Sequence, residues 1–349
     1  GILLFGAGLI GGRLRQGSMN TTAFSFGPLG AKGFAFLNML QLIGWTSIMI
    51  YDAMLALQAL APLSPMIWTI AIGALVILWL FIGLHNTGYI QAIVSVLLLG
   101  LTLYMGAHMI SQWPSEGSLL TSGNMSFIAA LELSIAMPLS WLPLISDYTR
   151  ESKHPFTASL TSATVYTVTS IVMYTLGLSA AIFGGGDSII TIMMNAGLGL
   201  AGLIVIIFST VTTTFMDAYS AGVSSTTIYN SASSKGIAVI VTIVGTIAAI
   251  LYPMDDITDF LYLIGSVFTP MIAILLADYF MNRQQVQTLS AFLVRGTIWA
   301  VSVGLYHYML HSESTVGATL PAFTMAFIIT TIIGFVSKAV KVSTEVKQP

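Results

Sequence analysis

The chain alternates long apolar stretches with short polar segments over nearly its whole length. A helix needs about 20 mostly apolar residues to cross the roughly 30 Å of a bilayer core. Stretches of that length cover residues 33–60, 66–84, 88–110, 125–147, 157–183, 196–230, 236–253, 257–281, 290–311 and 318–337. Residues 1–12 are apolar but too short to span, so we expect them to form part of a helix. The pattern predicts an all-α polytopic membrane protein, with residues 1–349 in one bundle.

The composition supports this fold class. Hydrophobic residues make up 56% of the chain and charged residues 7%, whereas a soluble domain carries roughly 25% charged residues. The sequence contains no cysteine, which excludes disulfides and thiol chemistry. We expect the lipid bilayer as a partner, and neither nucleic acid nor an obligatory protein partner.

The basic residues predict the orientation in the membrane. Loops 61–65, 111–124, 184–195, 254–256 and 312–317 contain no Lys or Arg. Every Lys and Arg falls on the other side of the predicted bundle, at positions 13, 15, 32, 150, 153, 235, 283, 295, 338, 341 and 347. Positive residues favour the cytoplasmic side. We therefore predict a multi-pass protein of the cell (inner or plasma) membrane with a cytoplasmic C-terminus.

Polar residues inside the third helix, counting residues 1–12 as the second, form one stripe. Asn38, Gln41, Trp45, Ile48 and Asp52 recur at helical spacing and share one face. An indole offers a flat surface to an aromatic ring, and an amide and a carboxylate can bind the edge of that ring. The stripe favours a ligand site, and a polar helix–helix contact is the alternative.

The segment from Glu132 to Asp147 predicts a broken helix. Pro138 and Pro143 each remove a backbone donor, and Ser140 and Trp141 lie between them. Discontinuous helices at mid-membrane mark binding sites in secondary transporters. A simple kink held by neighbouring helices is the alternative.

The segment 209–220 is rich in hydroxyl groups, with four Thr and two Ser. Their oxygens suit a small hard cation such as Na⁺, although hydroxyls in membrane helices also bond within the helix. Asp217 follows Thr213 by one turn on the same face. Asp52, Glu132 and Asp217 are costly in an apolar span unless they face water, a partner or a ligand. We expect all three at one polar cavity, where a carboxylate could alternatively take up H⁺.

Two further acids, Asp147 and Asp278, lie at the ends of their spans and are followed by Arg150 and Arg283. We expect structural roles for them, as helix caps or as ion pairs at an inner gate.

Four segments carry a resemblance to a known family. Phe24–Gly27, Gln41–Trp45, Ser146–Arg150 and Ala277–Arg283 are similar in sequence and order to motifs of the nucleobase:cation symporter-1 family. Within that family the chain most resembles the CytX branch, whose members are proposed to import hydroxymethylpyrimidine, a thiamine precursor.

The resemblance implies an inverted five-plus-five helix repeat, the leucine-transporter-like fold, followed by two extra helices. Residues 33–281 correspond to the repeat core and residues 290–337 to two accessory helices. Residues 1–12 correspond to the remnant of the second helix, which leaves the first helix absent from this chain.

The resemblance also implies a substrate that stacks on Trp45 and bonds Gln41. The family's sodium site corresponds to Ser209, Thr212 and Thr213, and would be incomplete without the first helix. Pro138 stands where the family usually has an aromatic residue, with Trp141 three residues later. Asp217 replaces an Asn of the cytosine and hydantoin carriers, and a carboxylate suits a basic aminopyrimidine.

Together these observations predict a secondary active importer of a pyrimidine-type heterocycle, hydroxymethylpyrimidine, coupled to Na⁺ or H⁺ and lacking a cofactor. A cytosine, purine or hydantoin symporter is the alternative. The predicted substrate-binding residues are Gln41, Trp45, Asp52, Glu132, Ser140, Trp141 and Asp217.

An enzyme is the rival from another class. Tyr51–Asp52 and Gly184–Asp187 match the Tyr-Asp and Gly-x-Gly-Asp motifs of intramembrane aspartyl proteases. In such proteases the motifs occupy successive helices, whereas three predicted spans separate them here. A channel is disfavoured because the chain has no repeated pore loop. We therefore predict a carrier without catalytic residues.

Overall fold

The computed structural model describes residues 1–60, 63–111, 126–183, 199–283, 285–286, 288–312 and 315–345, and these ranges contain helices, turns and loops but no strand. The first seven helices are α1 (Ile2–Leu14), α2 (Ser18–Thr21), α3 (Ala23–Leu60), α4 (Pro65–Ile82), α5 (Leu84–Ser111), α6 (Phe127–Leu139) and α7 (Ile145–Thr149). The rest are α8 (Pro155–Phe183), α10 (Gly199–Ile228), α11 (Ser234–Leu251), α12 (Thr258–Leu276), the π-helix η1 (Ala277–Asn282), α13 (Leu289–His311) and α14 (Thr319–Glu345).

The long helices match the predicted spans. Within the described ranges, nine helical segments are long and apolar enough to cross a membrane. They correspond to nine of the predicted stretches, and α6 and α7 together occupy the remaining one, residues 125–147. The prediction of an all-α polytopic membrane protein is confirmed.

The bundle has a buried centre and an apolar exterior. The span formed by α12 and η1 is central, with 78% of an 18-residue stretch buried, whereas only 11% of the corresponding stretch of α8 is buried. Many large apolar side chains of α8 are exposed, as at Val165 and Ile171. Apolar surface of this kind suits contact with lipid tails rather than water.

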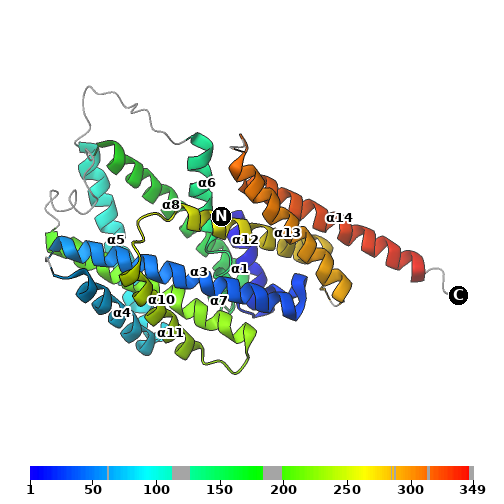
Figure 1. Cartoon of the computed structure of the whole chain (residues 1–349), viewed down its shortest axis with the longest axis horizontal. Coiled ribbons are helices and arrows are strands. Elements are labelled where there is room, and N and C mark those ends of the chain that lie inside the picture. The colour runs from blue at the N-terminus through cyan, green and yellow to red at the C-terminus, as the bar shows by residue number, and fades with distance from the viewer. Residues whose placement is uncertain are drawn as a thin grey trace.

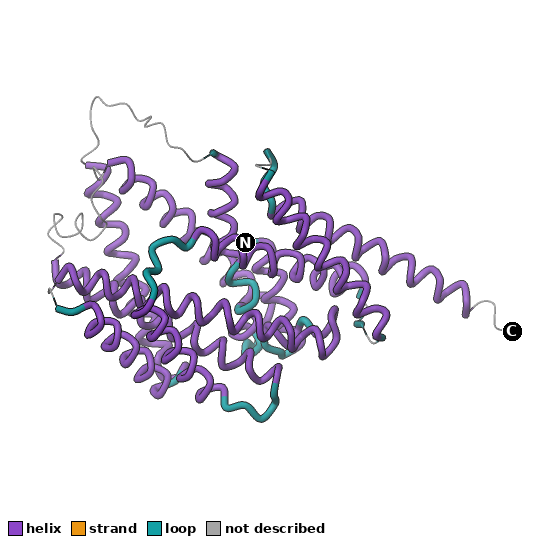
Figure 2. Tube along the Cα trace, in the orientation of Figure 1, coloured by secondary structure: helices purple, strands orange, loops and turns teal. Residues whose placement is uncertain are grey.

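The helices pack in distinct groups (Figure 1). Helix α3 packs along α10 and α11, with α4 beside them, and α1 packs against α7 and α8. Helices α13 and α14 pack together beside α12, and α14 runs out to the C-terminal end of the molecule. Figure 2 shows that the described connections between these helices are short compared with the helices themselves.

A sharp turn sets the direction of α3. Gly27 has φ 64°, which interrupts the helical backbone between Ala23 and Leu60. Glycine adopts this left-handed region without steric cost, and the fixed φ of Pro28 suits the first position of the helix that follows. The turn lies at the end of Phe24–Gly27, one of the four segments that carry the family resemblance.

Candidate functional site

The broken helix that the two prolines predicted is present. Helix α6 ends at Leu139, α7 begins at Ile145, and turns connect them. Ser140 and Trp141 lie at this break, which faces α3 and α10. The break therefore exposes polar backbone inside the bundle, where water cannot reach it freely.

A small closed cavity lies where α3, the α6–α7 break and α10 meet. It is lined by Trp45, Met49, Met137, Ser140, Trp141, Leu144, Thr213 and Asp217. The structure thus brings together four of the predicted binding residues, Trp45, Ser140, Trp141 and Asp217. We call this space the central cavity, and the role of its residues in binding stays a prediction.

The central cavity is closed in this conformation. Its volume is about 20 Å³, which is room for about one water molecule, so a pyrimidine ring does not fit. The Trp45 ring packs edge-on against Phe260 on α12, with centroids 5.6 Å apart. Trp141 packs against Tyr166 on α8 at 5.8 Å. Ligand entry therefore requires these rings or their helices to move apart.

Polar atoms beside the cavity lack protein partners. Gln41 Nε2 donates to the backbone oxygen of Ser140 at 2.9 Å, so Gln41 braces the break and is not among the residues that line the cavity. Within the described ranges, Gln41 Oε1 and Trp45 Nε1 are buried without a hydrogen-bond partner. Leaving such groups unpaired costs free energy, and a ligand with complementary groups would remove that cost.

Asp217 and Thr213 line the cavity from the same face of α10, as their spacing predicted. The hydroxyls of Thr212 and Thr213 both donate to the Ser209 backbone oxygen at 2.9 Å. This is the pattern of hydroxyl bonding within a helix, and each hydroxyl oxygen keeps lone pairs that can face a cation. The residues present fit part of a cation site, and Na⁺ binding stays a prediction.

Asp52 does not belong to the central cavity, so its predicted position there is wrong. Its side chain is exposed, and the neighbouring Tyr51 hydroxyl donates to Asp255 at 3.2 Å. Asp52 follows Trp45 by seven residues, which places it roughly 10 Å farther along α3. The helical stripe continues beyond the cavity toward the end of the bundle at which α3 ends.

Glu132 also lies outside the central cavity, contrary to the prediction. Its carboxylate accepts hydrogen bonds from the Thr319 backbone N–H, at 3.1 and 3.2 Å, and from the Thr319 hydroxyl. Thr319 is the first residue of α14, where free N–H groups favour an anion. Glu132 therefore fastens α6 to α14. It lines a separate space of about 830 Å³ with Asp259 and His307.

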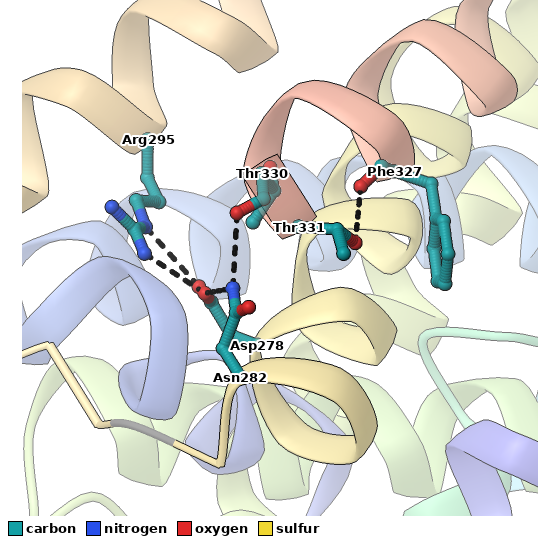
Figure 3. A network of polar contacts seen from close by, with 6 residues as sticks. All are labelled: Asp278, Asn282, Arg295, Phe327, Thr330 and Thr331. Atoms are coloured by element: carbon teal, nitrogen blue, oxygen red, sulfur yellow. Dashed lines mark hydrogen bonds and ion pairs between the residues drawn. The ribbon is translucent and has the colours of Figure 1, made fainter. Parts of the chain in front are cut away.

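Asp278 has a structural partner that the sequence did not indicate. Figure 3 shows its carboxylate facing Arg295 of α13, with contacts of 2.9 and 3.3 Å. Asn282 Nδ2 donates to Asp278 and to the Thr330 backbone oxygen, both at 3.0 Å. The adjacent Arg283 ends η1 with a left-handed backbone, φ 52°. Asp278 therefore joins η1 to α13, and Asn282 extends the contact to α14.

Asp147 is also buried in a structural contact, where it accepts the Ser18 backbone N–H at 2.8 Å. Arg150 forms an ion pair with Glu151 at 3.3 Å. Asp187, the second carboxylate of the protease hypothesis, lies outside the described residues.

Sequence reasoning missed the apolar part of the cavity. Met49, Met137 and Leu144 line it, and Phe260 packs on Trp45. Met49 follows Trp45 by one helical turn, so the stripe could have indicated it. Phe260 is more than 200 residues away in sequence, and no local pattern reveals that contact.

A bundle of apolar spanning helices, with a broken helix beside a buried cavity lined by indoles, apolar side chains and a carboxylate, is typical of a membrane carrier of the discontinuous-helix type. A sequence profile of the family described as permease for cytosine/purines, uracil, thiamine, allantoin matches residues 1–348. The chain belongs to this family.

The relatives that match individually have low sequence identity to this chain. Cytosine permease of Escherichia coli (strain K12) is 25% identical over 185 residues, which cover 52% of this chain and 44% of the permease. The chain therefore matches less than half the length of this relative. The same figures hold for cytosine permease of Escherichia coli O157:H7.

Solved structures share the fold. Mhp1, a nucleobase-cation-symport-1 family transporter in a closed conformation with bromovinylhydantoin bound, matches with a TM-score of 0.79 and 17% identity over 97% of this chain and 83% of Mhp1. The inward-facing conformation of Mhp1 gives a TM-score of 0.75 at 17% identity, covering 97% of this chain and 81% of that structure. A Na⁺-coupled sialic acid symporter gives 0.68 at 16% identity, covering 96% and 83%. The leucine-transporter-like fold class is confirmed.

Proposed function

We propose that the chain is a secondary active transporter that imports a pyrimidine-type heterocycle, with hydroxymethylpyrimidine as the favoured substrate. The observation that carries the proposal is the convergence of Trp45, Trp141 and Asp217 on one buried cavity. Family membership supports carriage of a nucleobase-like compound.

The side chains around the cavity suit an aminopyrimidine. An indole face stacks on a flat heteroaromatic ring. The Asp217 carboxylate can accept hydrogen bonds from an exocyclic amino group or a protonated ring nitrogen, and such charge-assisted bonds are stronger than neutral ones. Gln41 Oε1 and Trp45 Nε1 add one acceptor and one donor near the ring edge. A hydantoin can also donate its ring N–H groups to the carboxylate, but it has no basic ring nitrogen that could be protonated and pair with the charge of Asp217.

Cytosine is the second candidate substrate. It also carries an exocyclic amino group on a pyrimidine ring, and a cytosine permease is among the relatives. The same contacts would therefore serve cytosine, so the two candidates differ in the substituents that the opened cavity must hold.

We further propose that a cation drives uptake. Coupling requires the cation to bind one conformation better than the other. Thr212 and Thr213 precede Asp217 by five and four residues on α10, so a Na⁺ there would favour the arrangement of α10 that binds substrate. Protonation of Asp217 is the alternative means of coupling. We propose a cell-membrane protein with its C-terminus in the cytoplasm, and the basic residues on one side of the predicted bundle support this orientation.

Uptake by the purified protein in proteoliposomes tests this function. Radiolabelled hydroxymethylpyrimidine should accumulate when an inward Na⁺ or H⁺ gradient is imposed, and unlabelled cytosine and hydantoin should be compared as competitors. Asp217→Asn should weaken competition by aminopyrimidines about tenfold or more, because a charge-assisted bond is lost. Glu151→Gln, at an exposed position on the other side of the break, is the matched control. Accumulation that ignores both gradients would contradict the proposal.

A further inference from the structure

The α6–α7 break leaves several backbone carbonyls without their usual helical donors, among them Ser140 O and Pro143 O. In a continuous helix, Ser140 O would accept from the Leu144 N–H and Pro143 O from the Asp147 N–H. The Leu144 N–H instead donates to Trp141 O at 3.0 Å, and the Asp147 N–H donates to Leu144 O at 2.9 Å. Both freed carbonyls lie in the interior, where an unpaired acceptor is costly.

Two amide side chains of α3 supply the missing donors. Gln41 Nε2 donates to Ser140 O at 2.9 Å, and Asn38 Nδ2 approaches Pro143 O at 3.4 Å. The two amides are three residues apart on α3, and the two carbonyls are three residues apart in the break. One face of α3 therefore supplies an amide donor to each of these two carbonyls.

Asn38 makes a further bond that Gln41 does not. Its Nδ2 also donates to Ser224 Oγ of α10 at 2.9 Å, so one amide joins α3, the break and α10. The Asn38 side chain is fully buried, with 0% exposure. A side-chain amide nitrogen has two hydrogens, and these two contacts use both of them.

This junction lies on one defined side of the central cavity. Asn38 precedes Trp45 by seven residues on α3, and Ser224 follows Asp217 by seven residues on α10. Because α10 and α3 pack together, both offsets place the junction roughly 10 Å from the cavity. The junction lies toward the end of the bundle where α3 begins and α10 ends. We call that end the basic side, since Lys32 and Lys235 lie near it.

We propose that Asn38 is a positioning residue that closes the central cavity toward the basic side, and that the cavity opens there only when its bonds to Pro143 and Ser224 break. The proposal rests on the proposed transport function, because alternating access requires the cavity to open to each side in turn. The bonds hold the broken helix against α3 and α10 in the closed state. Asn38 thereby sets the balance between closed and basic-side-open conformations.

Single-cysteine labelling tests this proposal directly, since the full chain contains no cysteine of its own. Leu144→Cys reports access to the cavity from the basic side, and Met49→Cys reports access from the opposite side; both residues line the cavity. Added to the Leu144→Cys protein, Asn38→Ala should raise the rate of labelling by a membrane-impermeant thiol reagent from the basic side. The expected rise is about tenfold, the effect of losing two neutral hydrogen bonds. Labelling of Met49→Cys from the opposite side should not rise.

The matched control is Ser47→Ala on the same helix, whose hydroxyl donates only to Ile43 O of its own helix and which should leave both rates unchanged. An unchanged Leu144→Cys rate, or an equal rise at both reporters, would overturn the proposal, because general loosening affects both sides. If Asn38→Ala does not fold, Ser224→Ala decides: it should raise basic-side labelling about threefold, and an unchanged rate would overturn the proposal. No substrate is used, so a wrong substrate assignment leaves this result intact.

Discussion

Gly44 allows an aromatic ring to approach α3 at the cavity. A Cβ atom at this position would lie 2.5 Å from Cζ of Phe260, well inside van der Waals contact. Phe260 in turn packs edge-on against Trp45. The glycine therefore fixes the position of Trp45 through its neighbour, although it does not itself line the cavity.

We expect Gly44→Ala to displace Phe260 and to destabilise the protein by about 1–3 kcal/mol, the usual cost of overpacking a core. Thermal unfolding in detergent measures the change. Gly33→Ala on the same helix is the control, because nothing lies within 4 Å of a Cβ there, and alanine is the better helix former. A Gly44→Ala protein as stable as the Gly33→Ala protein would refute this packing argument.

The three intramembrane acids show how far residue type alone predicts a site. All three are carboxylates inside apolar spans, yet only Asp217 faces the central cavity. Asp52 is exposed two turns beyond Trp45, and Glu132 caps α14. Helical spacing placed Asp217 correctly relative to Thr213. It could not show where along α3 the cavity ends, nor that Glu132 meets a residue 187 positions away.

Helices η1, α13 and α14 are held together by a buried ion pair and its hydrogen bonds. Arg295 and Asp278 have side-chain exposures of 8% and 0% and meet at 2.9 Å. Asn282 adds bonds to Asp278 and to α14. Figure 3 shows these groups converging from the three helices. Because the pair is buried, neither charge can be solvated by water if the other is removed.

Arg295→Ala should therefore cost about 3–5 kcal/mol of stability, the penalty of an uncompensated buried charge. Replacing both partners by apolar residues, Asp278→Leu with Arg295→Met, should restore much of that loss. Thermal unfolding of the single and double variants provides the measurement. Glu151→Ala is the control, since it removes an exposed ion pair with Arg150 worth at most about 1 kcal/mol. A double variant as unstable as Arg295→Ala would contradict this explanation.

Sequence patterns predicted the helices and the break more completely than the contacts between helices. Apolar length predicted every span, and two prolines five residues apart predicted the end of α6 near Leu139. Asp278 pairs with Arg295 rather than with Arg283, which follows it by five residues. This pairing depends on how α13 packs against η1. Likewise, the match between α3 amides and carbonyls of the break arises only when the two elements are side by side. Periodicity within one helix carries no information on such pairings.

The molecule as a whole has a chemically asymmetric surface. The segment between α10 and α11 leads into Lys235, the second residue of α11, and the segment between α11 and α12 carries Asp255 and Asp256. Since α11 crosses the bundle between these two segments, they lie on opposite sides. From the positive-inside rule we expect the first segment to face the cytoplasm.

Cysteines at exposed positions of the two segments test the orientation. In intact cells, a membrane-impermeant maleimide should label Tyr252→Cys and should leave Ser231→Cys unlabelled until the membrane is permeabilised. Both native side chains are exposed, so accessibility within the protein is matched. The opposite labelling pattern would contradict the orientation and would place the C-terminus outside the cytoplasm.

The central claim is that α3, the α6–α7 break and α10 form one aminopyrimidine site around Trp45 and Asp217. Equilibrium binding of hydroxymethylpyrimidine and cytosine to the purified protein tests it most directly, in the unchanged chain and in Trp45→Ala, Asp217→Asn and Asp52→Asn. Loss of base stacking is worth about 1–3 kcal/mol, so Trp45→Ala should weaken binding by about tenfold or more, as should Asp217→Asn, while Asp52→Asn should bind normally. Loss of binding in Asp52→Asn, with normal binding in the other two variants, would contradict the account.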